Sequence, residues 1–340
     1  MTAVLEVLNL KVGFATEDGP VRAVNDVSFS VQAGEILAIV GESGCGKSVT
    51  AMSIPGLLPP SADVEGSILL DGEDLRALPD RELRRVRGKE VSVVFQEPMT
   101  SLNPAFTVGK QIREVLQRHQ GLSKRDAHQK AVELLDLVQI PAPQRRVDEY
   151  PHQLSGGMRQ RVMIAIGIAN SPKLLIADEP TTALDVTIQA GVLDIMKDLR
   201  ERLGMAIIII THDLGVVADV ADRVVVMYAG RPVEEASVHE LFAHPQHPYT
   251  VGLLGAIPHR EKGVEVVAQQ RLTEIPGLVP LLRADPDECT FHPRCPRATD
   301  ICRSKRPPLE PVRPGHPAAC YHPGETSQEF PSDGATGGQP

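Results

Sequence analysis

The sequence is poor in aromatic residues and in clustered positive charge. Phe, Trp and Tyr make up 3% of its 340 residues, and Trp is absent. Proteins that bind single-stranded nucleic acid stack the bases on aromatic side chains, and DNA-binding proteins carry Lys and Arg patches. This chain has 35 basic and 44 acidic residues, a formal net charge of −9, and no dense basic tract. We therefore expect no nucleic-acid partner.

Long apolar runs are also missing. Runs such as 206–210 fall far short of the roughly 20 apolar residues that a helix needs to cross a bilayer. Residues 1–6 do not combine a basic region with an apolar stretch, as a secretion signal would. We expect an intracellular protein that reaches a membrane only through a protein partner.

A glycine-rich loop at 41–48 follows the apolar run 36–40, which predicts a buried strand that turns directly into a helix beginning near Lys47. Glycine lets successive backbone N–H groups point at one anion, and the positive end of the helix dipole adds to the attraction. Lys47 would reach the β- and γ-phosphates and Ser48 would bind Mg²⁺, so we predict a nucleoside triphosphate site. The residues expected at the nucleotide are Gly41, Glu42, Ser43, Gly44, Cys45, Gly46, Lys47, Ser48 and Val49.

Two further patterns add to this site. Asp178 and Glu179 end the apolar run 174–177, where Asp178 could hold Mg²⁺ and Glu179 could polarise an attacking water. Ser155, Gly156 and Gly157 precede an apolar helical pattern, which predicts a second helix N-terminus able to bind an anion. One nucleotide does not need two such anion sites in one chain.

Together these motifs resemble those of the ATP-binding cassette (ABC) ATPases, over nearly all of residues 4–243. The family implies an α/β fold, a P-loop NTPase with a RecA-like, mostly parallel sheet, an antiparallel β subdomain and an inserted helical subdomain. It also implies that two cassettes pack head to tail, so that the signature segment of one acts on the nucleotide held by the other. The matching segments are 41–48, Gln96, 154–158, Asp178 with Glu179, 182–185 and His212.

The resemblance assigns roles to individual residues. Glu179 would be the catalytic base, with Lys47 and His212 contacting the γ-phosphate. Gln96 would contact Mg²⁺ or the attacking water, and Asp185 would close contacts between the two ATPase halves. Phe14 is either a core residue or stacks on the adenine.

Two segments are similar to the bacterial and archaeal oligopeptide/dipeptide importer ATPases, namely 97–104 and 247–250, although the second could be an ordinary loop. The likeness implies a subunit at the cytoplasmic face of the cell membrane that hydrolyses ATP to import peptides or a related small solute. The implied partners are two membrane permease subunits, an extracytoplasmic solute-binding protein and a second ABC ATPase subunit, either a related chain or a copy of this one. There are two alternatives. The protein could power the uptake of nickel or glutathione, or it could be a soluble ABC ATPase that acts on nucleic acid or ribosomes.

Four of the five cysteines lie near the end of the chain, in a proline-rich segment. In a reducing cytosol such a cluster is more typical of a metal site than of disulfides. Similar spacings in this subfamily bind a [4Fe–4S] cluster, which here would be structural or a redox sensor. Zn²⁺ is the alternative metal, although the paired Cys-x2-Cys spacing usual for zinc is missing. The four expected ligands are Cys289, Cys295, Cys302 and Cys320.

Several expectations concern local structure. Pro55 should kink or end the helix after Lys47, Ser123 should cap another helix, and Cys45 could make the loop sensitive to oxidation. The histidines near the cysteines, at 292, 316 and 322, are expected to be loop residues rather than ligands. Predicted strands lie at 27–31, 36–40, 91–95, 174–177, 206–210 and 224–227, and predicted helices at 187–203 and 214–221.

We expect the ABC ATPase domain at 1–243, with its helical subdomain at about 97–170. The C-terminal extension with the metal-binding cysteines would follow at 244–323. Residues 324–340 are rich in Gly, Ser and Pro, which predicts a disordered tail.

Overall fold

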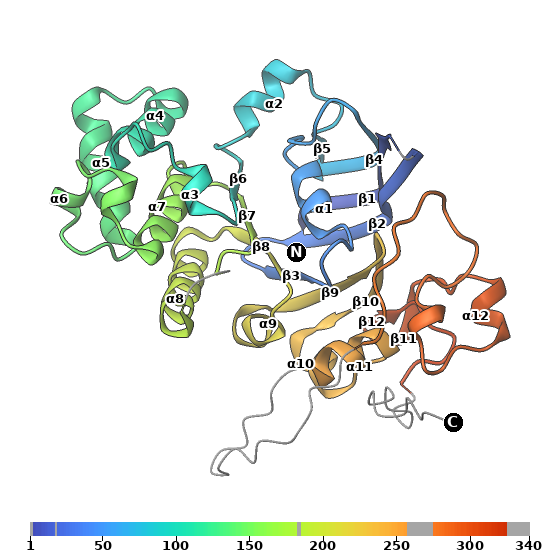
Figure 1. The fold of residues 1–340 in the computed structure, drawn as a ribbon. Helices are drawn as coiled ribbons and strands as arrows, with labels where there is room; N and C mark the ends of the chain where they lie inside the picture. Colours follow the sequence, from blue (N-terminus) through green and yellow to red (C-terminus); the bar gives the residue numbers. More distant parts are fainter. Residues whose placement is uncertain (1–2, 18, 182–184, 257–274, 325–340) are drawn as a thin grey trace, which may run out of the picture.

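The computed structural model describes residues 3–17, 19–181, 185–256 and 275–324 (Figure 1). Within these ranges the strands form an eight-stranded and a four-stranded sheet. The strands of the larger sheet are β3 (Ile36–Val40), β6 (Val91–Val94), β7 (Leu174–Asp178), β8 (Ala206–Thr211), β9 (Arg223–Tyr228), β10 (Arg231–Ser237), β11 (Glu310–Arg313) and β12 (His316–Ala318). Their order across the sheet is β11-β12-β10-β9-β3-β8-β7-β6.

The neighbouring strands β9, β3, β8, β7 and β6 are parallel. Every residue of β3, β7 and β8 is buried, as expected for a parallel sheet covered on both faces. Val40 pairs with Thr211 and Val226, and Asp178 pairs with Ile210, so these strands end at one edge of the sheet. Ligands of open α/β sheets bind at such an edge. The predicted strands of this sheet are confirmed, whereas β10, β11 and β12 were not predicted.

The four-stranded sheet is antiparallel and packs against the larger one (Figure 1). Alternate apolar side chains of its first strand are buried in the same cluster as Leu37 and Ile39 of β3. The first helix of the chain, α1 (Lys47–Ser53), contributes Ala51 to this cluster and ends just before Pro55, as predicted. The predicted antiparallel β subdomain is therefore confirmed. Its strands are β1 (Ala3–Thr16), β2 (Gly19–Gln32), β4 (Ala62–Leu70) and β5 (Glu73–Asp74).

The inserted helical group lies at one end of the larger sheet (Figure 1). Ser123 caps one of its helices as predicted, since the Oγ accepts a hydrogen bond from the Asp126 N–H. No helix in the described part of the chain is long and apolar enough to cross a membrane. The helices α3 to α7 are α3 (Pro98–Ser101), α4 (Val108–Gln120), α5 (Lys124–Leu137), α6 (Pro143–Arg146) and α7 (Gly156–Ile168). The other helices are α2 (Asp80–Val86), α8 (Val186–Leu203), α9 (Leu214–Val220), α10 (Val238–Ala243), α11 (Pro248–Gly255) and α12 (Asp300–Ser304), with short 3-10 helices η1 (Pro151–Gln153) and η2 (His292–Arg294).

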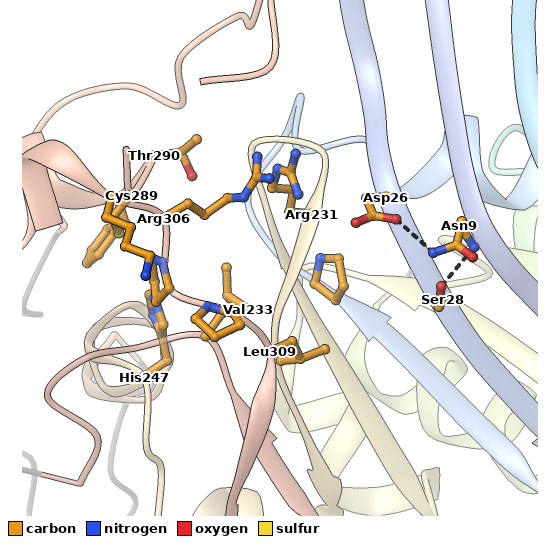
Figure 2. A pocket seen from close by; sticks show the side chains of 16 residues that line it. Asn9, Asp26, Ser28, Arg231, Val233, His247, Cys289, Thr290, Arg306 and Leu309 are labelled. Carbon is orange, nitrogen blue, oxygen red and sulfur yellow. Dashed lines mark hydrogen bonds between the residues drawn. The ribbon is translucent and has the colours of Figure 1, made fainter. Parts of the chain in front are cut away.

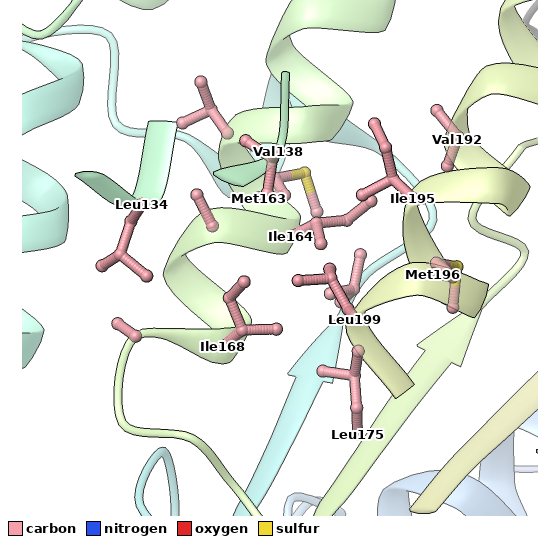
Figure 3. Packing of buried hydrophobic residues seen from close by; sticks show 14 of the residues in the cluster. Leu134, Val138, Met163, Ile164, Ile168, Leu175, Val192, Ile195, Met196 and Leu199 are labelled. Carbon is pink, nitrogen blue, oxygen red and sulfur yellow. The ribbon is translucent and has the colours of Figure 1, made fainter. Parts of the chain in front are cut away.

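One apolar cluster joins the helical group to the sheet (Figure 3). Leu134 of α5 and Ile164 of α7 pack in the same cluster as Leu199 of α8 and Leu175 of β7. Because these side chains are buried together, α7 is fixed against the strand that carries Asp178.

The C-terminal module, residues 275–324, completes the larger sheet. Its strand β12 pairs with β10, with Ala318 opposite Glu234. Glu234 and His316 are fully buried, and the His316 Nε2 lies 2.7 Å from the Glu234 Oε1. The same carboxylate accepts the backbone N–H groups of Gln246 (2.7 Å) and His247 (2.8 Å). The prediction that His316 is a loop residue was wrong, because this carboxylate holds it in a strand.

Removal of the buried carboxylate should destabilise the fold. In Glu234→Ala the His316 ring and two buried backbone N–H groups lose their acceptor, so we expect the free energy of unfolding to fall by about 3 kcal/mol. Urea unfolding followed by circular dichroism measures the change. The matched control is Glu310→Ala on β11, whose exposed side chain should cost less than about 0.5 kcal/mol. Equal losses in the two variants would contradict this role for Glu234.

Candidate functional site

The phosphate loop, residues 41–48, joins the end of β3 to the start of α1, as predicted. Its backbone depends on glycine, since φ is +151° at Gly41 and +98° at Gly46. A Cβ at Gly46 would lie 2.3 Å from the Ala23 carbonyl oxygen, and one at Gly41 would lie 2.3 Å from the Met227 carbonyl oxygen. No larger residue fits at either position.

The Lys47 ammonium group lies within this loop. Its Nζ donates hydrogen bonds to the carbonyl oxygens of Gly41 (2.7 Å) and Glu42 (2.9 Å). Cys45 is fully buried beside it, and burial raises the pKa of the Cys45 thiol. Oxidation requires an accessible thiolate, so this environment argues against the predicted sensitivity of the loop to oxidation.

The two predicted Mg²⁺ ligands lie next to each other. The Ser48 Oγ donates a hydrogen bond of 3.1 Å to the Asp178 Oδ1. Burial raises the pKa of Asp178, an effect that the Ser48 hydrogen bond opposes and the Glu179 charge strengthens. A hydroxyl and a carboxylate oxygen are hard donors of the kind that Mg²⁺ prefers, so these residues fit the ion.

Glu179 lies between two other predicted site residues. Its Oε2 accepts a hydrogen bond from the Gln96 Nε2 (2.7 Å), and its Oε1 lies 3.0 Å from the His212 Nδ1. The backbone of Glu179 is left-handed, with φ +46°, and its N–H donates to the Ile210 carbonyl oxygen (2.8 Å). The ends of β6, β7 and β8 thus bring a carboxylate, an amide and an imidazole together, which suits the activation of one water molecule.

The signature residues lie elsewhere. Ser155 caps α7, and its Oγ accepts the Met158 N–H at 3.3 Å. A Cβ at Gly157 would lie 2.5 Å from the Ile188 side chain, so glycine is needed for the contact with α8. In Figure 1, α7 lies in the helical group, well away from α1. The structure therefore does not bring Ser155, Gly156 and Gly157 to the phosphate loop of the same chain.

The remaining residues predicted at the nucleotide lie on β1, on α1 and at the start of α8. Phe14 on β1 is half-buried and packs against the core cluster of the small sheet, so both of its proposed roles stay open. Val49 is half-buried on α1. Asp185 is exposed at the start of α8, and its side chain makes no capping hydrogen bond there. The predicted segment 182–184 lies outside the described residues.

Two C-terminal residues reach the phosphate loop, which the sequence did not predict. The Tyr249 hydroxyl accepts the Glu42 backbone N–H at 2.8 Å, and the Arg294 guanidinium binds the Glu42 carboxylate at 2.7 and 2.9 Å. The segment 247–250 is thus no ordinary loop but begins α11, where the His247 Nδ1 accepts the Tyr249 N–H. Burial lowers the pKa of His247 to about 4. The sequence hinted at these contacts only through Glu42, a carboxylate in a loop that is predicted to bind an anion.

The four C-terminal cysteines gather in the C-terminal module. Burial raises the pKa of Cys289 to about 11 and that of Cys320 to about 12, and the charges of neighbouring cysteines add to both shifts. Within residues 275–324 and the other described ranges, no three His, Cys, Asp or Glu side chains are arranged to hold a metal ion. The described residues therefore give no support to the predicted [4Fe–4S] cluster or to the Zn²⁺ alternative.

A cavity of about 660 Å³ lies between the small sheet and the C-terminal module (Figure 2). Asp26 lines one side of it and Cys289 the other. Arg231 and Arg306 lie side by side in it because both bind Asp285. None of its lining residues belongs to the phosphate loop, so this cavity is not the predicted nucleotide site.

Comparisons with known proteins agree with this geometry. The family model described as "ABC transporter" matches residues 24–182, and the model described as "Oligopeptide/dipeptide transporter, C-terminal region" matches residues 233–302. The chain is 53% identical over 323 residues to a probable peptide ABC transporter ATP-binding protein, y4tR, of Sinorhizobium fredii, covering 94% of this chain and 95% of that relative. It is 50% identical over 322 residues to the oligopeptide transport ATP-binding protein OppD of Salmonella typhimurium, covering 94% of each.

Solved structures show the same fold. A dimeric ATP-binding cassette, MJ0796, in a post-hydrolysis state with ADP and Pi has a TM-score of 0.62 at 28% identity, over 69% of this chain and 98% of that chain. The protein cbiO1 of Clostridium perfringens, part of the ABC transporter complex cbiONQ, has a TM-score of 0.61 at 29% identity, over 72% of this chain and 92% of that one. The chain therefore belongs to the ATP-hydrolysing subunits of ABC transporters, and it carries the C-terminal region of the oligopeptide/dipeptide transporters.

Proposed function

We propose that this protein hydrolyses ATP to drive the uptake of dipeptides or oligopeptides through two membrane permease subunits. The convergence of Gln96, Glu179 and His212 beside the Ser48–Asp178 pair carries the proposal for ATP hydrolysis. The C-terminal family match and the peptide-transport names of its relatives support the substrate class over nickel or glutathione. They equally disfavour a soluble ATPase that acts on nucleic acid or ribosomes.

Each residue of the site has a task in this reaction. The backbone N–H groups of residues 43–48 and the Lys47 ammonium would bind the phosphates, and Ser48 with Asp178 would hold Mg²⁺, which would supply positive charge at the phosphates. A Glu179 oxygen takes the proton of the attacking water. Gln96 and His212 orient this carboxylate from its two sides, and His212 is the residue that would reach the γ-phosphate.

The site in one chain is incomplete. Ser155 and Gly157 lie on α7, away from the phosphate loop of their own chain (Figure 1). We infer that the signature segment of a second ATPase subunit, a related chain or a copy of this one, closes the nucleotide site. Asp185, exposed at the start of α8, would contact that subunit. The similar cassette MJ0796 bound to ADP and Pi is dimeric.

Contact with the permeases would lie beside Gln96. Phe95 and Met99, on either side of it, have 42% and 66% of their surface exposed, so they offer apolar surface to a partner. Gln96 touches Glu179, so a change at the nucleotide reaches this surface directly. The protein would thereby act as a peripheral subunit at the cytoplasmic face of the membrane, with a solute-binding protein on the other side. We retain the ATPase domain at 1–243 and the extension at 244–323 as proposed boundaries.

Loss of the proposed base should separate binding from turnover. In Glu179→Gln we expect ATP affinity to stay within about twofold while hydrolysis falls by about 100-fold or more, because an amide cannot accept the proton. Steady-state phosphate release and size-exclusion chromatography with ATP measure turnover and dimer accumulation. Glu201→Gln, at an exposed position of α8, is the matched control with unchanged turnover. Brisk hydrolysis by Glu179→Gln would refute its role as the base.

Loss of the loop cation should remove nucleotide binding. In Lys47→Ala we expect the Kd for ATP to rise at least about tenfold, because the phosphates lose a charged hydrogen-bond donor. Isothermal titration calorimetry measures this affinity. Lys130→Ala on the surface of α5 is the control and should bind ATP normally. If Lys47→Ala bound ATP as tightly as wild type, the nucleotide would have to lie elsewhere.

The predicted metal of the cysteine module is tested separately. If a [4Fe–4S] cluster forms, anaerobically purified protein is brown and Cys295→Ser loses the colour, because one of four thiolate ligands is gone. Cys45→Ser, outside the module, should keep it. Colourless wild-type protein with stoichiometric zinc would favour Zn²⁺, and protein without either metal would end both hypotheses. Redox-dependent transport in vesicles would mark the cluster as a sensor rather than a structural element.

A further inference from the structure

Glu42 places a negative charge in a loop whose ligand is itself an anion. The Arg294 guanidinium binds both oxygens of this carboxylate, with distances of 2.7 and 2.9 Å. Two parallel N–H···O bonds of this kind fix the orientation of both side chains. The charge of Glu42 is therefore neutralised by a residue that lies 252 positions later in the chain.

Arg294 is held as firmly as the carboxylate it binds. Its side chain is 5% exposed. The Nε donates to the Pro276 carbonyl oxygen (2.8 Å) and the Nη2 to that of Ile275 (3.0 Å), while the Nη1 lies 3.5 Å from the Tyr228 hydroxyl. These contacts leave the guanidinium no freedom to follow a moving loop.

Tyr249 holds the backbone of the same loop residue. It is fully buried, and its hydroxyl accepts the Glu42 N–H at 2.8 Å. Its ring packs edge-on against Tyr228, with centroids 4.8 Å apart, and both rings contact Phe291 of the C-terminal module. This aromatic cluster connects α11 and the C-terminal module to β9, whose last residues lie beside the loop (Figure 1).

We propose that Arg294 and Tyr249 are positioning residues through which the C-terminal region sets the affinity of the phosphate loop for ATP. The Glu42 carbonyl accepts a hydrogen bond from the Lys47 Nζ, so the orientation of this peptide helps to place the catalytic lysine. Loss of Arg294 would release the Glu42 charge toward the triphosphate, which it repels. The proposal rests on the proposed nucleotide site and adds a role for the C-terminal region in that site.

A double-variant experiment separates this role from a purely structural one. In Arg294→Met we expect the Kd and KM for ATP to rise about tenfold, with kcat at saturating ATP nearly unchanged. Glu42→Gln keeps an acceptor but removes the repelling charge, so its own Kd is measured as the reference for the double variant. The combination of both substitutions should recover most of the lost affinity, because the repelling charge is gone. If Arg294 were only a structural anchor, the double variant would recover none of the lost ATP affinity.

The matched control is Arg313→Met, in the same module but paired with Glu240 instead of the loop. It should leave both Kd and KM unchanged. Lys47→Ala tests the proposed nucleotide site separately from the positioning role. If that variant bound ATP normally, the proposed nucleotide site itself would be wrong. If Lys47→Ala loses ATP while Arg294→Met binds it normally, only the positioning role is refuted. A double variant as weak as Arg294→Met would refute it too.

Folding is checked by thermal unfolding of each variant. If Arg294→Met does not fold, Tyr249→Phe decides, because it keeps the aromatic packing and removes only the acceptor of the Glu42 N–H. We then expect a raised KM for ATP with a nearly unchanged melting temperature. An unchanged KM in a folded Tyr249→Phe protein would overturn the proposal.

Discussion

The parallel pairing of β3, β8, β7 and β6 is the constraint on which the site depends. Parallel strands end at one edge, so the phosphate loop, the acidic end of β7, Gln96 and His212 meet there although they are far apart in the sequence. The apolar cluster between α5, α7, α8 and β7 then fixes the helical group to the same edge. Catalytic geometry and the attachment of the helical group are thus set by one sheet.

The C-terminal module extends this sheet at its other end. Glu234 of β10 binds His316 and the two backbone N–H groups that precede α11, and so sets where Tyr249 lies. Tyr249 and Arg294 in turn bind Glu42. A continuous series of buried contacts therefore runs from the added strands to the phosphate loop. The C-terminal region is therefore packed against the loop that we propose binds the nucleotide.

The sequence predicted those features that have a local pattern. The apolar runs of β3, β7 and β8 predict buried strands, and the glycine spacing predicts a phosphate loop. These patterns placed Lys47 at the start of a helix and Asp178 and Glu179 at the end of a strand, where the structure has them. The strands β11 and β12 were missed because they are short and rich in proline, with no alternation to detect. The pairing of Arg294 with Glu42 joins residues at opposite ends of the chain, and no spacing rule encodes such a contact. The metal prediction rested on the cysteine spacing and on the resemblance to a subfamily, and neither fixes the positions of the sulfur atoms.

The charge of Glu42 links the phosphate loop to the C-terminal module. A carboxylate beside bound phosphates raises the energy of the complex unless a cation neutralises it, and the cation here comes from outside the ATPase core. The proposed role of the signature segment likewise requires a second subunit, because α7 lies far from the loop of its own chain. In the proposed site the sheet edge binds the nucleotide, a C-terminal arginine neutralises Glu42 in the phosphate loop, and a second subunit supplies the signature segment. On this proposal the affinity for ATP depends on all three.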